Sequence, residues 1–364
     1  MTILDLEMLP AAEGDALLLA YGDEDSPHYI LIDGGRRSTY KNLRDRILEI
    51  PLGEDGKRFF ELLVVTHVDA DHIEGIICLL QDKELKCRFG DIWFNDWVHL
   101  EPLVEGQRPP DLGPEQGEFL GALLHKLELP WNKAFHGGAV VIPPEPDPLP
   151  FVDLADDLRL TLVSPTVETL IDLRNKWTKV IKDAGFTPGN RDEALEQFAD
   201  KAWSGLPASL GDEDHSNTLD HSEANGSSIA FLLEYGEARL LLSGDAFPQV
   251  LRPALDRWRA EQDDPSERVW LDAFKVPHHG SKKNLTPQLM DCIECESYLV
   301  STSGARFRHP DVDAIKIIID GHSGENAPEL MFNYRSRDNE FYDGRDDCTA
   351  FYGDDAVLRY EILD

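Results

Sequence analysis

The sequence predicts an α/β fold in which functional residues lie where buried strands end. An apolar run at 62–65 leads into a short loop that contains four possible metal ligands, and an apolar, helix-like stretch follows at 73–80. Two more apolar strands, expected at 238–242 and 269–276, are followed closely by an Asp and by a pair of histidines. Loops that leave strands and open into helices are where α/β folds place their chemistry.

Composition limits the class of protein. The 364 residues, 41% of them hydrophobic, suffice for one large domain with insertions or two modest ones. The net charge of −34 opposes non-specific binding to nucleic acid, so a polyanionic substrate would need a local basic strip or a partner protein to guide it. Five cysteines are few and odd in number, which favours a reducing compartment. We find no secretory signal and no run of about 18 apolar residues, so we expect a cytoplasmic protein without a membrane partner.

The first half of the chain alternates strands and helices. Residues 38–50 are expected to form a helix with Ser38 or Thr39 as its N-cap, because these hydroxyls accept hydrogen bonds from free backbone N–H groups. Asp33 directly follows the third strand in an Asp-Gly-Gly turn. The strands are expected at 2–9, 17–21, 28–32, 61–65, 91–97, 139–142 and 158–164, and a further helix at 117–128.

Residues 166–223 interrupt this pattern and are interpreted as an insertion that could cover the site as a lid. They hold two helical stretches, at 167–185 and 191–203, and an acidic polar run from 211 that contains His215 and His221. The composition of that run favours a solvated loop over a third metal site.

The second half begins with a hairpin, 229–234 and 238–242, that leads to Asp245. A helix at 248–261 and strands at 269–276 and 298–302 follow. Residues 323–364 hold several short strands, and we interpret them as an extension of the domain formed by residues 1–322. This extension, or the acidic surface, could contact another protein.

The loop HVDADH is the strongest chemical signal. Imidazole is a ligand for zinc, iron and manganese, whereas carboxylates favour harder cations and can bridge two of them. Residues two apart in an extended segment point the same way, so His67, Asp69 and Asp71 could share a side. His72, at the start of the helix, could join Asp71 on a second metal. The alternative is an acidic, solvated turn with a helix-capping Asp, which would rarely need two histidines.

This loop resembles the metallo-β-lactamase superfamily signature His-x-His-x-Asp-His, with Asp69 in place of the second histidine. With LIDGG before it, and SGDA and PHHGS after it, the chain more particularly resembles the branch that contains the ComEC competence nuclease domain and the phosphorylcholine esterases. The region of Asn225 resembles the Asn-x-x-Ser that replaces a histidine motif in that branch. The resemblance covers roughly residues 2–320, apart from the insertion.

The resemblance implies an αββα sandwich that holds two divalent metal ions, zinc or manganese. Site one would use His67 and Asp69, site two Asp71, His72 and His279, and Asp245 would bridge them, with Asp33 as structural support. It also implies that a hydroxide bridging the metals attacks phosphorus. Further residues implied in catalysis, beside Asp71, are His278 and His309. Phosphate contacts are expected from Ser281, Lys282, Arg306 and Arg308.

Three functional hypotheses remain open at this point. The leading one is hydrolysis of phosphodiesters in DNA or RNA. The second is hydrolysis of a small phosphodiester, such as a nucleotide or a phosphocholine ester, which the acidic composition favours. The third is a partner-regulated effector subunit of a toxin or defence assembly. Lactamase activity is not expected, since only the name of the fold suggests it.

Overall fold

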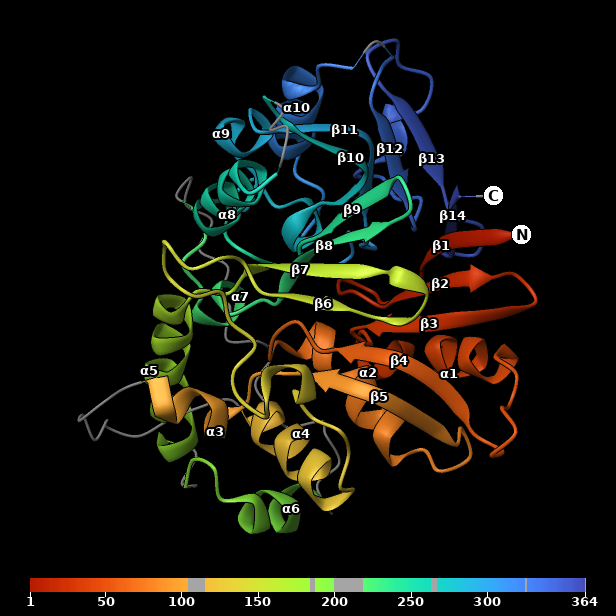
Figure 1. Cartoon of the computed structure of the whole chain (residues 1–364). Helices are drawn as coiled ribbons and strands as arrows, with labels where there is room; N and C mark the ends of the chain where they lie inside the picture. The colour runs from red at the N-terminus through yellow and green to blue at the C-terminus, as the bar shows by residue number, and fades with distance from the viewer. Residues whose placement is uncertain (104–114, 184–186, 200–218, 263–266, 325, 364) are drawn as a thin grey trace.

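The computed structural model describes residues 1–103, 115–183, 187–199, 219–262, 267–324 and 326–363. Two β-sheets form the centre of the molecule (Figure 1). The first has six strands in the order β14-β1-β2-β3-β4-β5. Their bounds are β1 Thr2–Met8, β2 Leu17–Asp23, β3 Ser26–Ile32, β4 Arg58–Val64, β5 Cys87–Trp93 and β14 Leu358–Leu363.

The second sheet has eight strands in the order β13-β12-β11-β10-β9-β8-β7-β6. Strands β9 to β13 run parallel to one another, while β6 to β9 pair in antiparallel fashion. The bounds are β6 Phe151–Asp153, β7 Arg159–Ser164, β8 Ala230–Tyr235, β9 Ala238–Leu242, β10 Val269–Lys275, β11 Ile293–Val300, β12 Glu329–Phe332 and β13 Thr349–Tyr352.

Helices cover the outer faces of both sheets. The α-helices are α1 Tyr40–Glu49, α2 Ala70–Gln81, α3 Trp97–Leu100, α4 Glu115–Lys126, α5 Val167–Asp183, α6 Arg191–Ala199, α7 Glu223–Gly226, α8 Pro248–Ala260, α9 Pro287–Met290 and α10 Val312–Gly321. Short 3₁₀ turns are η1 Arg37–Thr39, η2 Glu101–Leu103, η3 Lys133–Phe135, η4 Ala155–Asp157, η5 Pro277–Gly280 and η6 Glu340–Tyr342. None of the helices in the described ranges has the length and apolarity that a membrane crossing requires.

Successive side chains of a strand point to opposite faces of the sheet, so the apolar side chains form two cores, one between the sheets and one under the helices of the first sheet. Leu17 and Leu19 of β2 pack in the core between the sheets, whereas Leu18 packs on the outer side with Leu43 of α1 and Ile73 of α2. In Figure 1, α1 and α2 lie beside the first sheet and α8, α9 and α10 beside the second. The αββα sandwich predicted from the sequence is therefore confirmed.

Some local expectations were wrong. Residues 91–97 are not one strand, because β5 ends at Trp93 and Asp96 accepts a hydrogen bond from Val98 N to cap α3. The strand expected at 139–142 is reduced to one bridge, from Ile142 to Thr166.

The short strands after residue 322 join both sheets: β12 and β13 extend the second, and β14 pairs with β1 in the first.

Candidate metal centre

Loops that leave parallel strands of both sheets meet at one edge of the sandwich. In the first sheet, β3 ends directly before Asp33 and β4 shortly before His67, and the two strands are parallel. In the second sheet, β9, β10 and β11 are parallel and end shortly before Asp245, His279 and Ser301. The carboxyl ends of parallel strands are where open α/β sheets bind ligands, so this edge is the candidate site.

Glycines allow the site loops to approach closely. A Cβ at Gly14, in the turn between β1 and β2, would lie 1.8 Å from the carbonyl oxygen of Asp71. A Cβ at Gly75 of α2 would lie 1.9 Å from the carbonyl oxygen of Gly34, directly after Asp33. Any larger side chain at these positions would push the first turn of α2 away from its neighbours, so these glycines help to fix the position of the ligand loop.

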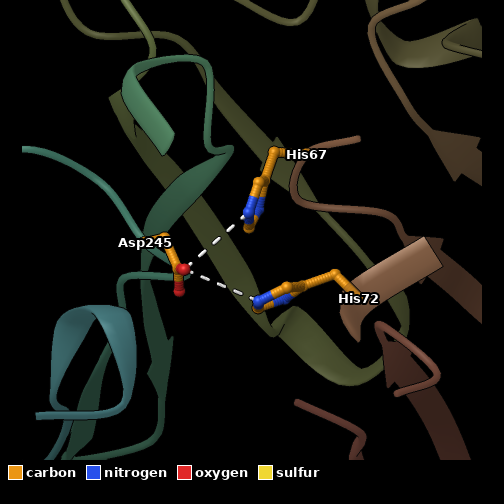
Figure 2. A group of neighbouring side chains, drawn as sticks. All are labelled: His67, His72 and Asp245. Carbon is orange, nitrogen blue, oxygen red and sulfur yellow. Dashed lines mark ion pairs between the residues drawn. The ribbon is translucent and has the colours of Figure 1, made fainter. Parts of the chain in front are cut away.

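Asp245 lies at the centre of the cluster. Its Oδ2 is 3.6 Å from Nε2 of His72 and 3.8 Å from Nε2 of both His67 and His279. Figure 2 shows His67 and His72 reaching Asp245 from the opposite side of the site. The three imidazoles belong to segments that follow strands of both sheets, so the carboxylate of Asp245 lies where these segments meet.

The other two carboxylates of the loop face individual histidines. Asp69 Oδ2 is 3.8 Å from Nε2 of His67, and Asp71 Oδ2 is 3.7 Å from Nε2 of His279. Donor atoms of Asp71, His72 and His279 lie within 4.8 Å of one another, as do those of His67, His72 and Asp245. The structure thus brings the six predicted ligand residues into one buried cluster.

Each of the three imidazoles is held through Nδ1 and presents Nε2 to the cluster. His72 Nδ1 donates to Asp33 Oδ2 at 2.8 Å, and His279 Nδ1 donates to the carbonyl of Ser301 at 2.9 Å. His67 Nδ1 lies 2.9 Å from the hydroxyl of Thr66. Hydrogen bonds of this kind, made by the ring nitrogen that faces away from the cluster, orient the histidine ligands of metals.

The cluster contains buried polar atoms without hydrogen-bond partners. Nε2 of His67, His72 and His279 are among them, as are Oδ1 of Asp69 and Asp245. Leaving such atoms unpaired costs free energy unless something else satisfies them. Three imidazole nitrogens together with carboxylate oxygens form a donor set that suits zinc or manganese, so the residues fit a site for divalent cations.

Burial and neighbouring charges shift the pKa values of the side chains in the cluster. Burial, helped by the charge of His72, lowers the pKa of His67 to about 3. Burial and the charge of Asp71 raise the pKa of Asp69 to about 7. Burial alone would raise the pKa of Asp245, but His279 and His72 hold it well below its usual range. Cations that bind here would compete with protons for the same ligands.

His278 is a fourth imidazole beside Asp245. Its Nε2 lies 3.9 Å from Asp245 Oδ2, and its Nδ1 lies 2.9 Å from Asn284 Oδ1 and 3.3 Å from Asp220 Oδ2. The ring centroid of His309 is 5.8 Å from that of His278, which places both predicted catalytic histidines at the same side of the cluster.

The backbone of the two adjacent histidines is strained. His278 has φ 48° and His279 has φ 54°, in the left-handed region that non-glycine residues rarely occupy. This conformation sends His279 toward Asp71 and His278 toward Asp220. Strain of this kind is concentrated at functional sites.

The four predicted phosphate contacts differ in their exposure and in their partners within the protein. Ser281 is buried and accepts a hydrogen bond from Lys283 N. Lys282 Nζ is 3.7 Å from Asp313, and Arg306 donates to Glu13 at 3.1 Å. Arg308 is exposed.

Three supporting residues were missed from the sequence. Asp15 and Lys275 form an ion pair beneath His279, with Asp15 Oδ1 3.4 Å from His279 Nδ1. Lys275 ends the apolar strand β10, and a lysine in such a strand could have indicated a buried ion pair. Asp220 contacts His278 and the amides of Asn225 and Asn284, but it lies in a polar run whose composition gives no such indication.

Glu118 of α4 anchors the insertion. It accepts hydrogen bonds from Trp177 Nε1 of α5 at 2.9 Å and from the backbone N–H of Gly189. His221 is exposed. The acidic run around His215 lies outside the described residues.

No protein-family model and no curated protein sequence matches the chain. Among solved structures, CmlA, a diiron β-hydroxylase from Streptomyces venezuelae, is similar over 99% of this chain at 12% identity, with a TM-score of 0.42. The chain spans about half of CmlA, 54% of its length. A metallo-β-lactamase of Cronobacter sakazakii with a HARLDQ motif is similar over 73% of this chain and 75% of its own, at 12% identity and a TM-score of 0.27.

Similarities this distant carry no information about the activity of this chain. The sheet order, the helices on both outer faces and the buried cluster at the strand ends are features of the molecule itself. The chain therefore has an αββα sandwich with a buried cluster of His and Asp side chains at the strand ends, whose donor atoms suit divalent metals.

Proposed function

We propose that the chain is a metal-dependent hydrolase that cleaves phosphodiester bonds. One observation carries the proposal: three buried imidazole Nε2 atoms without hydrogen-bond partners converge on the carboxylate of Asp245. A cluster that serves only stability would pair these atoms, because unpaired buried polar groups are costly.

Divalent cations bound here would supply Lewis acidity toward an ester oxygen and acidify water. His67, His72 and His279 would hold them together with the carboxylates of Asp69, Asp71 and Asp245. Thr66, Asp33 and Ser301 keep the imidazoles oriented.

We expect His278 to act on the substrate. Asp220 and Asn284 fix its ring through Nδ1, which directs Nε2 toward the centre of the cluster. A positioned imidazole can donate a hydrogen bond or a proton to the oxygen that leaves phosphorus. His309, next to His278, is the second candidate for this contact.

Phosphorus is favoured as the centre attacked because the loops resemble nuclease and phosphorylcholine esterase motifs. In addition, Lys282 follows His279 closely in the sequence, and Arg306 and Arg308 lie just before His309. The net charge of −34 makes a small phosphodiester a more suitable substrate than DNA or RNA. A partner protein, acting through the acidic surface or through residues 323–364, stays a prediction.

The test is hydrolysis of bis-(p-nitrophenyl) phosphate in separate reactions with Mn²⁺, Zn²⁺ and Mg²⁺. We expect release of p-nitrophenol with at least one metal, and none after addition of EDTA. Labelled DNA and RNA are incubated in parallel to separate nuclease activity from action on small substrates. Metal-loaded protein that cleaves none of these phosphodiesters would contradict the proposal.

A further inference from the structure

The insertion forms one wall of a cavity beside the metal cluster. The cavity has a volume of about 560 Å³, within the range of ligand pockets. One wall is the polar face of α5, with Thr169, Asp172, Asn175, Lys176 and Lys179. These residues recur at intervals of three or four, as one face of a helix requires.

The opposite face of α5 is apolar and buried. Leu170, Leu173 and Trp177 are fully buried against the outer core of the first sheet. Trp177 is also tied to Glu118 of α4. Packing on that side fixes the rotation of α5, so the polar face is held toward the cavity.

The second wall consists of loops that also build the metal centre. Gly226 and Phe247 line the cavity. Asn225, directly before Gly226, has its side-chain amide 3.3 Å from His278 Nδ1, and Phe247 lies two residues after Asp245. A ligand in this cavity would therefore lie next to the site where the metals would bind.

The side chains that line the cavity indicate the chemical class of the ligand. Lys176 Nζ is 3.6 Å from Glu223, and Lys179 forms no ion pair with the described residues. These two ammonium groups balance the carboxylates of Asp172 and Glu223 in the same lining, in a chain whose net charge is −34. Asn175 and Thr169 offer hydrogen bonds, and Phe247 offers an aromatic ring.

We propose that this cavity binds the nucleoside phosphate portion of a small phosphodiester. Lys176 and Lys179 would bind a phosphate that is not cleaved, and Asn175 and Phe247 would contact the nucleoside. The inference rests on the proposed function, since the scissile phosphate would lie in the metal cluster. Because Asp172 and Glu223 also line the cavity, it has no surplus of positive charge for the repeated phosphates of a nucleic-acid strand, which favours a small substrate over a polymer.

The direct test is binding of AMP to metal-free protein in EDTA, measured by calorimetry. We expect wild type to bind AMP and the variant Lys176→Ala/Lys179→Ala to bind at least about tenfold more weakly, because two charge-assisted contacts are lost. The matched control is Lys41→Ala/Lys316→Ala, which removes the same charge from two exposed helical lysines. Failure of wild type to bind AMP, or equal binding by the two double variants, would overturn the proposal.

Kinetics separate this inference from the proposed function. The dinucleotide pApA carries an additional phosphate, which bis-(p-nitrophenyl) phosphate lacks. We expect the cavity variant to raise KM for pApA at least about tenfold while leaving hydrolysis of bis-(p-nitrophenyl) phosphate within about twofold of wild type. AMP binding lost in the variant without any hydrolysis by wild type would refute the function and support the cavity. Hydrolysis with AMP binding equal in both double variants would refute only the cavity.

Discussion

The ammonium of Lys275 lies 2.8 Å from Oδ2 of Asp15, and only 1% of either side chain is exposed. The pair joins β10 to the turn between β1 and β2, and so ties the two sheets together beneath His279. Burial would raise the pKa of Asp15, but Lys275 and His279 hold it well below its usual range. The carboxylate of Asp15 is therefore kept charged in the interior by its neighbours, Lys275 above all.

Removing one partner of this pair leaves an unpaired buried charge. We expect Asp15→Asn and Lys275→Met each to lower the free energy of unfolding by about 3–5 kcal/mol, and the double variant to lose less than the sum. Urea unfolding of wild type, the two single variants and the double variant measures these free energies. Lys316→Met, which breaks an exposed pair on α10, should cost about 0.5 kcal/mol or less. Equal small losses at the buried and exposed pairs would show that the buried pair does not stabilise the fold.

Asp33 acts on metal binding through His72. Its carboxylate accepts from His72 Nδ1 at 2.8 Å and from Thr66 N and Oγ1 at 2.8 and 2.7 Å. We expect Asp33→Asn to weaken the affinity for divalent metal about 10- to 100-fold, because the hydrogen bond that orients the His72 ring would be weakened. Titration of metal-free protein with Zn²⁺ measures this change. Unaltered affinity in a folded variant would mean that Asp33 serves the turn and not the metal.

His278 should affect turnover more than metal content. We expect His278→Ala to retain its metals and to lower kcat about 10²- to 10⁴-fold, the usual contribution of a general acid. His125→Ala, at an exposed position of α4, is the control and should match wild type. If His278→Ala loses metal instead, the residue is a ligand, which its distance of 3.9 Å from Asp245 also permits.

Glu118 makes stability depend on pH. Burial and the charge of Asp96 raise the pKa of Glu118 from 4.5 in the unfolded chain to about 7. Between these two pKa values the folded state therefore binds more protons than the unfolded state. The contribution of Glu118 to the free energy of unfolding is fully present below pH 4.5 and is lost as the pH rises through 7. The shift corresponds to a loss on the order of 3 kcal/mol.

The measurement for Glu118 is urea unfolding at pH 5 and pH 8. We expect Glu118→Gln to reduce the difference between the two conditions, because the amide does not titrate. Glu128→Gln, at an exposed site just after α4, should behave as wild type. A pH difference that is unchanged in Glu118→Gln would assign the effect to other groups.

Local patterns in the sequence predicted the elements that build the site. Strand β9 has the predicted bounds, Ala238–Leu242, because an apolar run between a Gly turn and a Gly-Asp end leaves little freedom. The six predicted ligand residues follow strand ends closely in the sequence, so the parallel strands bring them together once the sheets form. The pattern of strands in the sequence was therefore enough to predict both the fold and the grouping of these residues.

Contacts between distant segments could not be predicted in this way. The partner of Asp15 lies 260 positions away at Lys275, and β14 pairs with β1 from the opposite end of the chain. Periodicity identifies a buried face but not what covers it. Asp220 has its role only because the chain folds back onto His278, and the cavity exists only because packing fixes the rotation of α5.

The number of metal ions bound per chain should be measured first, by mass spectrometry of wild type and Asp245→Ala after metal loading and desalting. We expect two divalent ions per wild-type chain. The variant should lose metal and essentially all hydrolysis of bis-(p-nitrophenyl) phosphate. A wild-type chain that binds no metal, or an Asp245→Ala variant with the metal content and activity of wild type, would contradict this expectation.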